Sequence, residues 1–151
     1  MDIQEYDFRT IMHYGWVWAS LVDDPSASNG HALRIPKNPF EWAARMSITA
    51  DDLLFENANA DTRFNVVVYA RCDATVNKGL ALNCSVFDDS GGKMVMQKNC
   101  DASEIAGLQY KKIEFGPIPF TKSMSIRFAP PSREGEVQAV YIDRVLLLKD
   151  Y

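Results

Sequence analysis

The sequence lacks the features that mark membrane proteins and nucleic-acid-binding proteins. No apolar run approaches the roughly 20 residues needed to cross a bilayer, and the longest apolar stretches, such as Val145 to Leu148, have the length of a strand. Lys and Arg number 16 against 20 Asp and Glu, which gives a net charge of −4. A chain with this balance has no basic field to collect phosphates. We therefore expect no insertion into a membrane and no nucleic-acid partner.

Signatures of common catalytic centres are also missing. The chain has no G-x-S-x-G nucleophile motif, no H-E-x-x-H zinc motif and no G-x-x-x-x-G-K-[ST] phosphate loop. Its two histidines, His13 and His31, are isolated from any such pattern. A pair of carboxylates for glycoside hydrolysis could be chosen from any chain with 20 acidic residues, so the acids alone carry no information. We expect a protein that is not an enzyme.

Cysteine is scarce and has no pattern. Cys72, Cys84 and Cys100 are odd in number and show neither C-x-x-C nor Cys/His spacing, so neither a disulfide framework nor a zinc site is indicated. Each stands in an apolar or strand-like setting, and we expect buried free thiols.

What the sequence does contain is alternation of apolar and polar residues with a period of two, which predicts strands. The predicted strands are Ile11 to Leu21, Glu41 to Thr49, Phe64 to Asp73, Gly79 to Asp88, Lys93 to Lys98, Gln109 to Phe115, Met124 to Ala129 and Val137 to Leu148. One helical turn is expected at Ala102 to Gly107. About nine or ten strands predict one all-β domain over residues 1–151, a two-sheet antiparallel jelly-roll sandwich or another Greek-key sandwich.

The strongest alternation lies in two neighbouring segments, Phe64 to Asp73 and Gly79 to Asp88. They predict a hairpin with one buried face. The residues expected in the core are Phe64, Val66, Val68, Ala70 and Cys72 on the first arm and Leu80, Leu82, Cys84 and Val86 on the second.

The outward residues of these arms are unlike those of a plain solvated sheet. They include Tyr69, Arg71, Asn83 and Phe87, and Arg127 lies on a later strand. A pyranose ring packs its C–H face on an aromatic ring, and its hydroxyls pair with planar groups that carry several donors or acceptors. These residues therefore predict a sugar-binding face. The structural alternative is that Tyr69 and Phe87 are cross-strand neighbours that stabilise the sheet.

A second aromatic row lies near the N-terminus. Tyr14, Trp16 and Trp18 occupy one face of a predicted strand and could stack successive sugar rings. Core packing is the favoured alternative for this row, because strand faces rich in tryptophan are usually buried.

Four segments together resemble a known family. An Asp-x-x-Ala-Ser-x-Gly-x-Ala-Leu loop at 24–33 follows a tryptophan-bearing strand. A Trp-Ala strand, the strand Phe-Asn-Val-Val-Val-Tyr-Ala-Arg at 64–71 and a closing Ala-Val-Tyr-Ile-Asp-Arg-Val strand at 139–145 come after it. Over nearly the whole chain this order is similar to that of jelly-roll carbohydrate-binding modules of the galactose-binding-domain-like group.

The resemblance implies a non-catalytic module that binds a glycan or polysaccharide, often attached to a secreted catalytic domain. It implies an extracellular, periplasmic or cell-surface location, although the first residues of the chain lack the pattern of a signal peptide. A protein-interaction or spacer domain that packs against a catalytic neighbour would use the same fold. A jelly-roll polysaccharide lyase is a minor alternative, with Tyr69, Arg71, Asn83 and Arg127 as the catalytic set.

The resemblance also implies one structural calcium ion. Asp23 would supply a carboxylate from the Asp-rich loop, and Asp143 would close the site from the last strand. Calcium binds six to eight oxygens in flexible geometry, which suits such a loop. The alternative without metal is that Asp143 pairs with an arginine, while Asp23 or Asp24 begins a turn before Pro25.

Overall fold

The computed structural model describes residues 3–7, 19–37, 43–49, 61–73, 78–120 and 123–150. In this part of the chain there are ten strands and one short helix. The strands are β1 (Ile3–Asp7), β2 (Ser20–Asp23), β3 (His31–Pro36), β4 (Ala44–Thr49), β5 (Arg63–Cys72), β6 (Leu80–Asp88), β7 (Lys93–Asp101), β8 (Lys111–Pro119), β9 (Ser123–Ala129) and β10 (Ala139–Asp150), and the helix is α2 (Ala102–Ile105).

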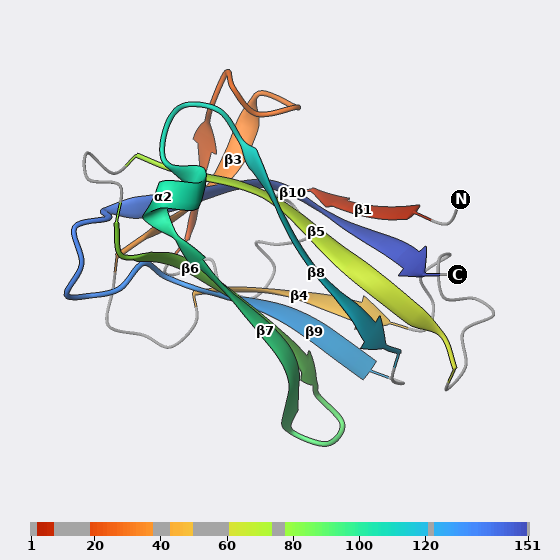
Figure 1. Ribbon diagram of the computed structural model, residues 1–151. Helices are drawn as coiled ribbons and strands as arrows, with labels where there is room; N and C mark the ends of the chain where they lie inside the picture. Colours follow the sequence, from red (N-terminus) through yellow and green to blue (C-terminus); the bar gives the residue numbers. More distant parts are fainter. Residues whose placement is uncertain are drawn as a thin grey trace.

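The strands form two antiparallel sheets that face each other (Figure 1). One sheet has six strands in the order β2-β3-β10-β5-β8, with β1 paired to the second half of β10. The other has four strands in the order β4-β9-β6-β7. This arrangement confirms the predicted all-β, two-sheet antiparallel jelly-roll sandwich. The longest strand, β10, pairs with β1, β3 and β5 and therefore organises the larger sheet.

The core lies between the sheets and contains the residues that alternation predicts, except Leu80, which is only partly buried. Phe64, Val66, Val68, Ala70 and Cys72 of β5 are fully buried, as are Leu82, Cys84 and Val86 of β6. β4 contributes Ala44, Met46 and Ile48, and β10 contributes Val140, Ile142, Val145 and Leu147. Burying such side chains stabilises the fold by roughly 1.5–3 kcal/mol each relative to exposure.

The predicted hairpin of β5 and β6 is wrong. β5 pairs with β10 and β8 in the six-stranded sheet, whereas β6 pairs with β7 and β9 in the four-stranded sheet. Alternation reports which residues face the core, but both sheets share one core. The pattern therefore looks the same whether consecutive strands pair or lie in opposite sheets.

The predicted helical turn is confirmed as α2, and its sequence explains where it begins. The Asp101 side chain accepts a hydrogen bond from the Ser103 backbone N–H, and the Glu104 side chain accepts one from the Asp101 backbone N–H. This reciprocal capping box satisfies donors that a helix start leaves unpaired. In the part of the chain that the structure describes, no helix has the length and apolar character needed to cross a membrane.

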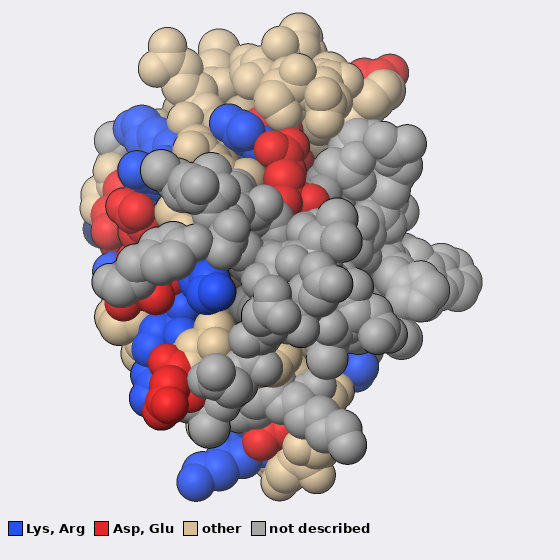
Figure 2. Space-filling view, turned by 90° about the vertical axis from the view of Figure 1, so that its right-hand side faces the viewer, with Lys and Arg blue, Asp and Glu red and all other residues tan. Residues whose placement is uncertain are grey.

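Charged side chains of both signs are interspersed along one side of the molecule. Figure 2 shows basic and acidic groups alternating there, and the end that carries the β2–β3 hairpin is mostly uncharged. This distribution agrees with the nearly balanced composition of the chain.

The three cysteines are free and buried, as the sequence predicts. Burial disfavours the thiolate and raises the pKa of Cys100 to about 12. The same cause raises the pKa of the Cys84 thiol. Since the thiolate is the reactive form, these cysteines are chemically protected in the folded state.

We expect the native protein to react negligibly with a chromogenic thiol reagent at neutral pH and to react at all three cysteines once it is unfolded in guanidinium. The measurement is the absorbance of the released chromophore with and without denaturant. Rapid reaction of any cysteine in the native state would contradict the burial seen here.

Candidate functional site

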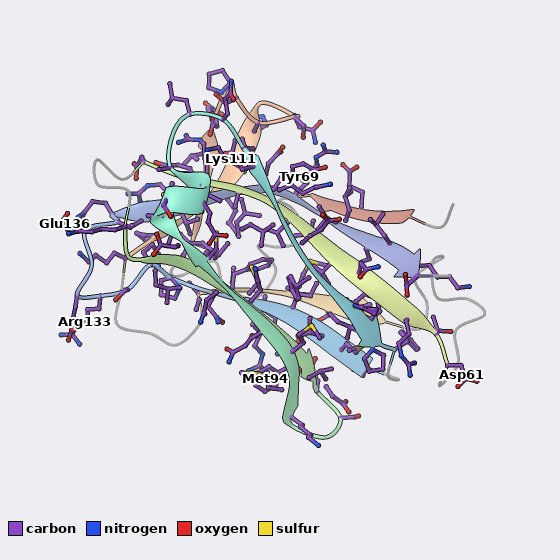
Figure 3. All side chains as sticks on the ribbon, in the orientation of Figure 1. Asp61, Tyr69, Met94, Lys111, Arg133 and Glu136 are labelled. Carbon is purple, nitrogen blue, oxygen red and sulfur yellow. The ribbon has the colours of Figure 1, made fainter. Side chains whose placement is uncertain are left out.

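The residues predicted to form one sugar-binding face lie on two opposite surfaces of the sandwich. Tyr69 and Arg71 point outward from the six-stranded sheet, whereas Asn83, Phe87 and Arg127 belong to the four-stranded sheet. Figure 3 shows Tyr69 on one side of the molecule, while Met94, the cross-strand partner of Phe87, lies on the other side. The single predicted face is therefore wrong, because it assumed that β5 and β6 were neighbours.

The outer face of the four-stranded sheet gathers aromatic, cationic and amide groups in adjacent rows. Strand register places Arg45, Arg127, Ser85 and Gln97 in one row across β4, β9, β6 and β7. The next row contains Ser47, Ser125, Phe87 and Met94. Asn83 and Asn99 are cross-strand partners on the other side of the first row. We call this surface the four-stranded face.

Phe87 and Arg127 form the centre of the four-stranded face. The guanidinium carbon of Arg127 lies 4.1 Å from the centroid of the Phe87 ring, within the range of a cation–π contact. Met94, which is 44% exposed, extends the apolar surface beside the ring. The four-stranded face therefore combines an exposed apolar side chain with an aromatic ring on which a cation is stacked.

Three amides flank this platform. The Asn83 side-chain amino group donates to the Gln97 carbonyl oxygen at 3.1 Å and to the Asn99 carbonyl oxygen at 2.6 Å. Asn83 thus holds the two β7 side chains in place through their oxygens. The amino groups of Gln97 and Asn99 and the Asn83 carbonyl oxygen are left as donors and an acceptor for a ligand.

Asp89 connects the β6–β7 turn to the arginines of the four-stranded face. Its carboxylate accepts a hydrogen bond from the Ser125 hydroxyl at 3.0 Å and one from Arg127 at 3.4 Å. Its other oxygen lies 3.9 Å from the Arg45 guanidinium. Asp89, for which the sequence suggested no role, therefore links the β6–β7 turn to the polar side chains of the four-stranded face.

Arg71 has a different role from the one predicted. It is only 8% exposed, and its Nε and Nη2 donate to one Asp24 oxygen at 3.1 and 2.8 Å. The Tyr110 hydroxyl donates to the same oxygen at 2.7 Å, and the Tyr141 ring lies 4.1 Å from the guanidinium carbon. Arg71 is therefore occupied by protein groups and is not a free partner for a sugar.

The ionisation of this cluster follows from its surroundings. Burial opposes the charge on Asp24, but hydrogen bonds from Tyr110, Arg71 and the Ser26 backbone outweigh it and hold the pKa of Asp24 below its ordinary value. Burial and the hydrogen bond to Asp24 raise the pKa of the Tyr110 hydroxyl. At neutral pH the group is a buried ion pair with a neutral tyrosine, which is a structural arrangement.

Tyr69 is half-buried under a neighbouring arginine. The Arg144 guanidinium carbon lies 4.3 Å from the centroid of the Tyr69 ring, and Arg144 also contacts Glu5 at 3.6 Å. Lys112 is the cross-strand partner of Tyr69 on β8. Because Tyr69 and Arg71 lie on one sheet while Asn83 and Arg127 lie on the other, the residue set considered for a lyase is not brought together.

The two aspartates predicted to bind calcium have protein partners of their own. Asp143 is 5% exposed, and its oxygens accept hydrogen bonds from the Ser28 backbone N–H at 3.1 Å and the Ser28 hydroxyl at 2.9 Å. The Asp23 side chain is 92% exposed and lies 3.0 Å from His31. In the described residues, no three His, Cys, Asp or Glu side chains are grouped to hold a metal. The structure gives Asp23 and Asp143 different protein partners, and the calcium ion implied by the resemblance stays a prediction.

The structure shows contacts of the kind expected for these aspartates without a metal. Asp24, rather than Asp23, begins the turn before Pro25, because its carboxylate accepts from the Ser26 backbone N–H at 2.9 Å. A register shift between Ile142 and Arg144 marks a β-bulge at Asp143, and such a bulge redirects a side chain. The bulge lets Asp143 hold the loop from β2 to β3.

Trp16 and Trp18, with Tyr14, lie outside the described residues. The sequence did not point to Arg45, Gln97, Asn99 or Asp89. A signal for the first three was available, since each occupies an outward position of a strand, but their convergence on Phe87 depends on strand order. Strand order depends on contacts across the whole sheet and could not be read from the individual strands.

Neither the known protein families nor the curated protein sequences contain a match to this chain. Solved structures do match. A family 6 carbohydrate-binding module from Cellvibrio mixtus lichenase 5A, in complex with cellotriose, has 8% sequence identity and a TM-score of 0.59, with 100% of both chains covered. A family 36 module of a multidomain xylanase, from the hindgut metagenome of Trinervitermes trinervoides, has 8% identity and a TM-score of 0.61, with 96% of this chain and 95% of that chain covered.

Larger proteins contain a similar unit. The exo-beta-1,3-galactanase from Phanerochaete chrysosporium matches over 97% of this chain with 13% identity and a TM-score of 0.55, but this chain spans only 29% of its length. At these identities the likeness is one of fold. The chain therefore has the two-sheet jelly-roll fold that these carbohydrate-binding modules also have.

Proposed function

We propose that this domain binds a glycan, without catalysis, through the four-stranded face. The observation that carries the proposal is the combination of the Phe87–Arg127 stack with the Asn83 amide cluster on one outer sheet surface. An aromatic ring offers a surface for the C–H face of a sugar, and the amides offer paired donors and acceptors for its hydroxyls. The opposite surface is a weaker candidate, because Arg71 is buried and paired with Asp24.

The fold comparison supports this choice. Two full-length structural matches are modules in complex with oligosaccharides, cellotriose in one case and beta-1,4-galactotriose in the other. The matching unit is also found as less than a third of larger chains, including the catalytic domain structure of Agl-KA. We propose that this domain likewise serves as an accessory to a catalytic neighbour, in an extracellular, periplasmic or cell-surface protein.

A domain that binds another protein would be expected to expose a continuous apolar patch. Among the described residues, the exposed large hydrophobic side chains are Leu21, Met94 and Leu108. Met94 belongs to the four-stranded face, whereas Leu21 lies on β2 in the other sheet and Leu108 follows α2, so the observed surface favours glycan binding.

Substituting Phe87→Ala should weaken glycan binding by about tenfold, because a stacking contact contributes roughly 0.5–1.5 kcal/mol beyond its buried area. The measurement is isothermal titration calorimetry against the best ligand from a panel of soluble polysaccharides. Tyr69→Ala, which removes an aromatic ring from the opposite surface, is the matched control and should keep the affinity of the parent. Loss of binding in Tyr69→Ala with retention in Phe87→Ala would move the site to the six-stranded sheet.

Substituting Arg71→Met should lower the free energy of unfolding by about 3 kcal/mol, because it leaves Asp24 buried without its cation. Urea denaturation at pH 7 measures this change. Lys112→Met, on an exposed side chain, should change stability by no more than about 0.5 kcal/mol. A folded Arg71→Met protein should still bind glycan, and selective loss of binding without loss of stability would contradict the structural role of Arg71.

Asp24 should also contribute to acid sensitivity. Its folded-state pKa lies below the ordinary value, so its stabilising contribution is complete above the unfolded-state pKa of about 3.9 and is lost as the pH falls through the folded-state pKa. Asp24→Asn removes this titration. Its unfolding free energy should therefore fall less steeply than that of the parent between about pH 5 and pH 2, and equal slopes in urea titrations would be the contrary result.

A further inference from the structure

Asn83 holds Gln97 and Asn99 by their side-chain oxygens. The Asn83 amino group donates to the Gln97 oxygen at 3.1 Å and to the Asn99 oxygen at 2.6 Å. An amide that accepts through its oxygen keeps both hydrogens of its amino group for another partner. Gln97 and Asn99 therefore each retain an uncharged amino group that can donate.

These two amino groups are donors on the outer surface. Gln97 and Asn99 are exposed, and in the part of the chain that the structure describes neither amino group donates to a protein acceptor. Acceptors are scarcer in this cluster, since the Asn83 side-chain oxygen is the one carbonyl oxygen that the three amides leave unused among themselves. The amide cluster is therefore neutral and richer in free donors than in free acceptors.

This surplus of donors favours one kind of ligand group. A sugar hydroxyl brings a donor and an acceptor together, so part of its hydrogen-bonding capacity finds no partner on the amide cluster. A carbonyl oxygen brings two lone pairs and no donor. The amino groups of Gln97 and Asn99 therefore match a carbonyl substituent better than they match a hydroxyl.

An exposed apolar side chain lies beside these donors. Met94 is 44% exposed and lies on the outer side of the four-stranded sheet (Figure 3). Strand register places Met94 in the row next to that of Gln97, on the same strand, and successive rows along a strand are about 7 Å apart. Two long side chains at this spacing can contact one small ligand group between them. A charged acceptor beside Met94 would lose hydration, whereas an apolar group gains from the contact.

We infer that the glycan recognised by the four-stranded face carries acetyl groups, with the acetyl carbonyl oxygen accepting from the Gln97 amino group and the acetyl methyl packed on Met94. Acetamido groups and O-acetyl esters share this chemistry, because each places an uncharged carbonyl acceptor next to a methyl. The Asn99 amino group remains available to a second acceptor of the same ligand. This inference rests on the proposed function, because it names the ligand class of the same site.

The experiment compares ligands that differ only in their acetyl groups, by isothermal titration calorimetry with the parent protein. Chitooligosaccharides are tested against cello-oligosaccharides of the same length, which carry a hydroxyl in place of the acetamido group. Acetylated xylan is tested against the same xylan after alkaline deacetylation, so the two pairs distinguish the amide from the ester. Galactan and β-glucan are titrated alongside them. We expect the acetylated member of at least one pair to bind roughly three- to tenfold more tightly, as one net hydrogen bond implies.

Variants then locate the contact. Gln97→Glu keeps the oxygen that accepts from Asn83 but replaces the amino group by an acceptor, so it should abolish the preference for the acetylated ligand. Met94→Gln should reduce that preference by removing the apolar contact. Gln109→Glu makes the same change in charge at an exposed position after α2 and should preserve the preference. Thermal unfolding verifies that each variant is folded, and an unchanged preference in Gln97→Glu would overturn the inference.

The outcomes separate the inference from the proposed function. Equal affinity within both pairs, or binding to galactan or β-glucan alone, would overturn the inference and leave glycan binding intact. Absence of binding to every acetylated and unacetylated ligand would overturn both. The comparison of ligand pairs uses the parent protein, so it stays decisive even if a variant does not fold.

Discussion

The packing of the two sheets against one core determines what each strand can present to a ligand. Every strand of a sandwich turns alternate residues toward the opposite sheet and the others away from it. The sheet to which a strand belongs therefore decides on which side of the molecule its outward residues lie. For β5 and β6 this constraint separates Tyr69 and Arg71 from Asn83 and Phe87 by the full thickness of the domain.

The two outer surfaces use similar residues for different purposes. On the six-stranded sheet, Arg71 and Asp24 form a buried ion pair that holds the loop after β2 to β5. On the four-stranded sheet, Arg127 lies on Phe87 and contacts Asp89 only at 3.4 Å. An arginine close to a phenyl or phenol ring is thus found on both sides. Burial and the tightness of the carboxylate contact distinguish Arg71 from Arg127.

The sequence was sufficient for the properties that depend on local pattern. Alternation identified the core residues of β5, such as Phe64 and Val66, and the helical turn expected at Ala102 to Gly107 corresponds to α2. The sequence did not predict the pairing of β5 and β6, because the choice between a hairpin and a crossover depends on their contacts with β10 and β9. Ala81 shows a second limit of alternation. The period of two predicts that Ala81 faces outward, but Ala81 is buried in the core, and the strand register shifts between Leu80 and Leu82.

The candidate site was only partly predictable for the same reason. Phe87, Asn83 and Arg127 were identified from their residue types, whereas Arg71 was misassigned because its burial depends on Asp24 and Tyr110, which are 47 and 39 positions away in the sequence. The aspartates of the expected calcium site illustrate the point further. Their residue type indicated possible metal ligands, whereas the contact of the Asp143 carboxylate with Ser28 accompanies a bulge in β10 that the sequence does not reveal.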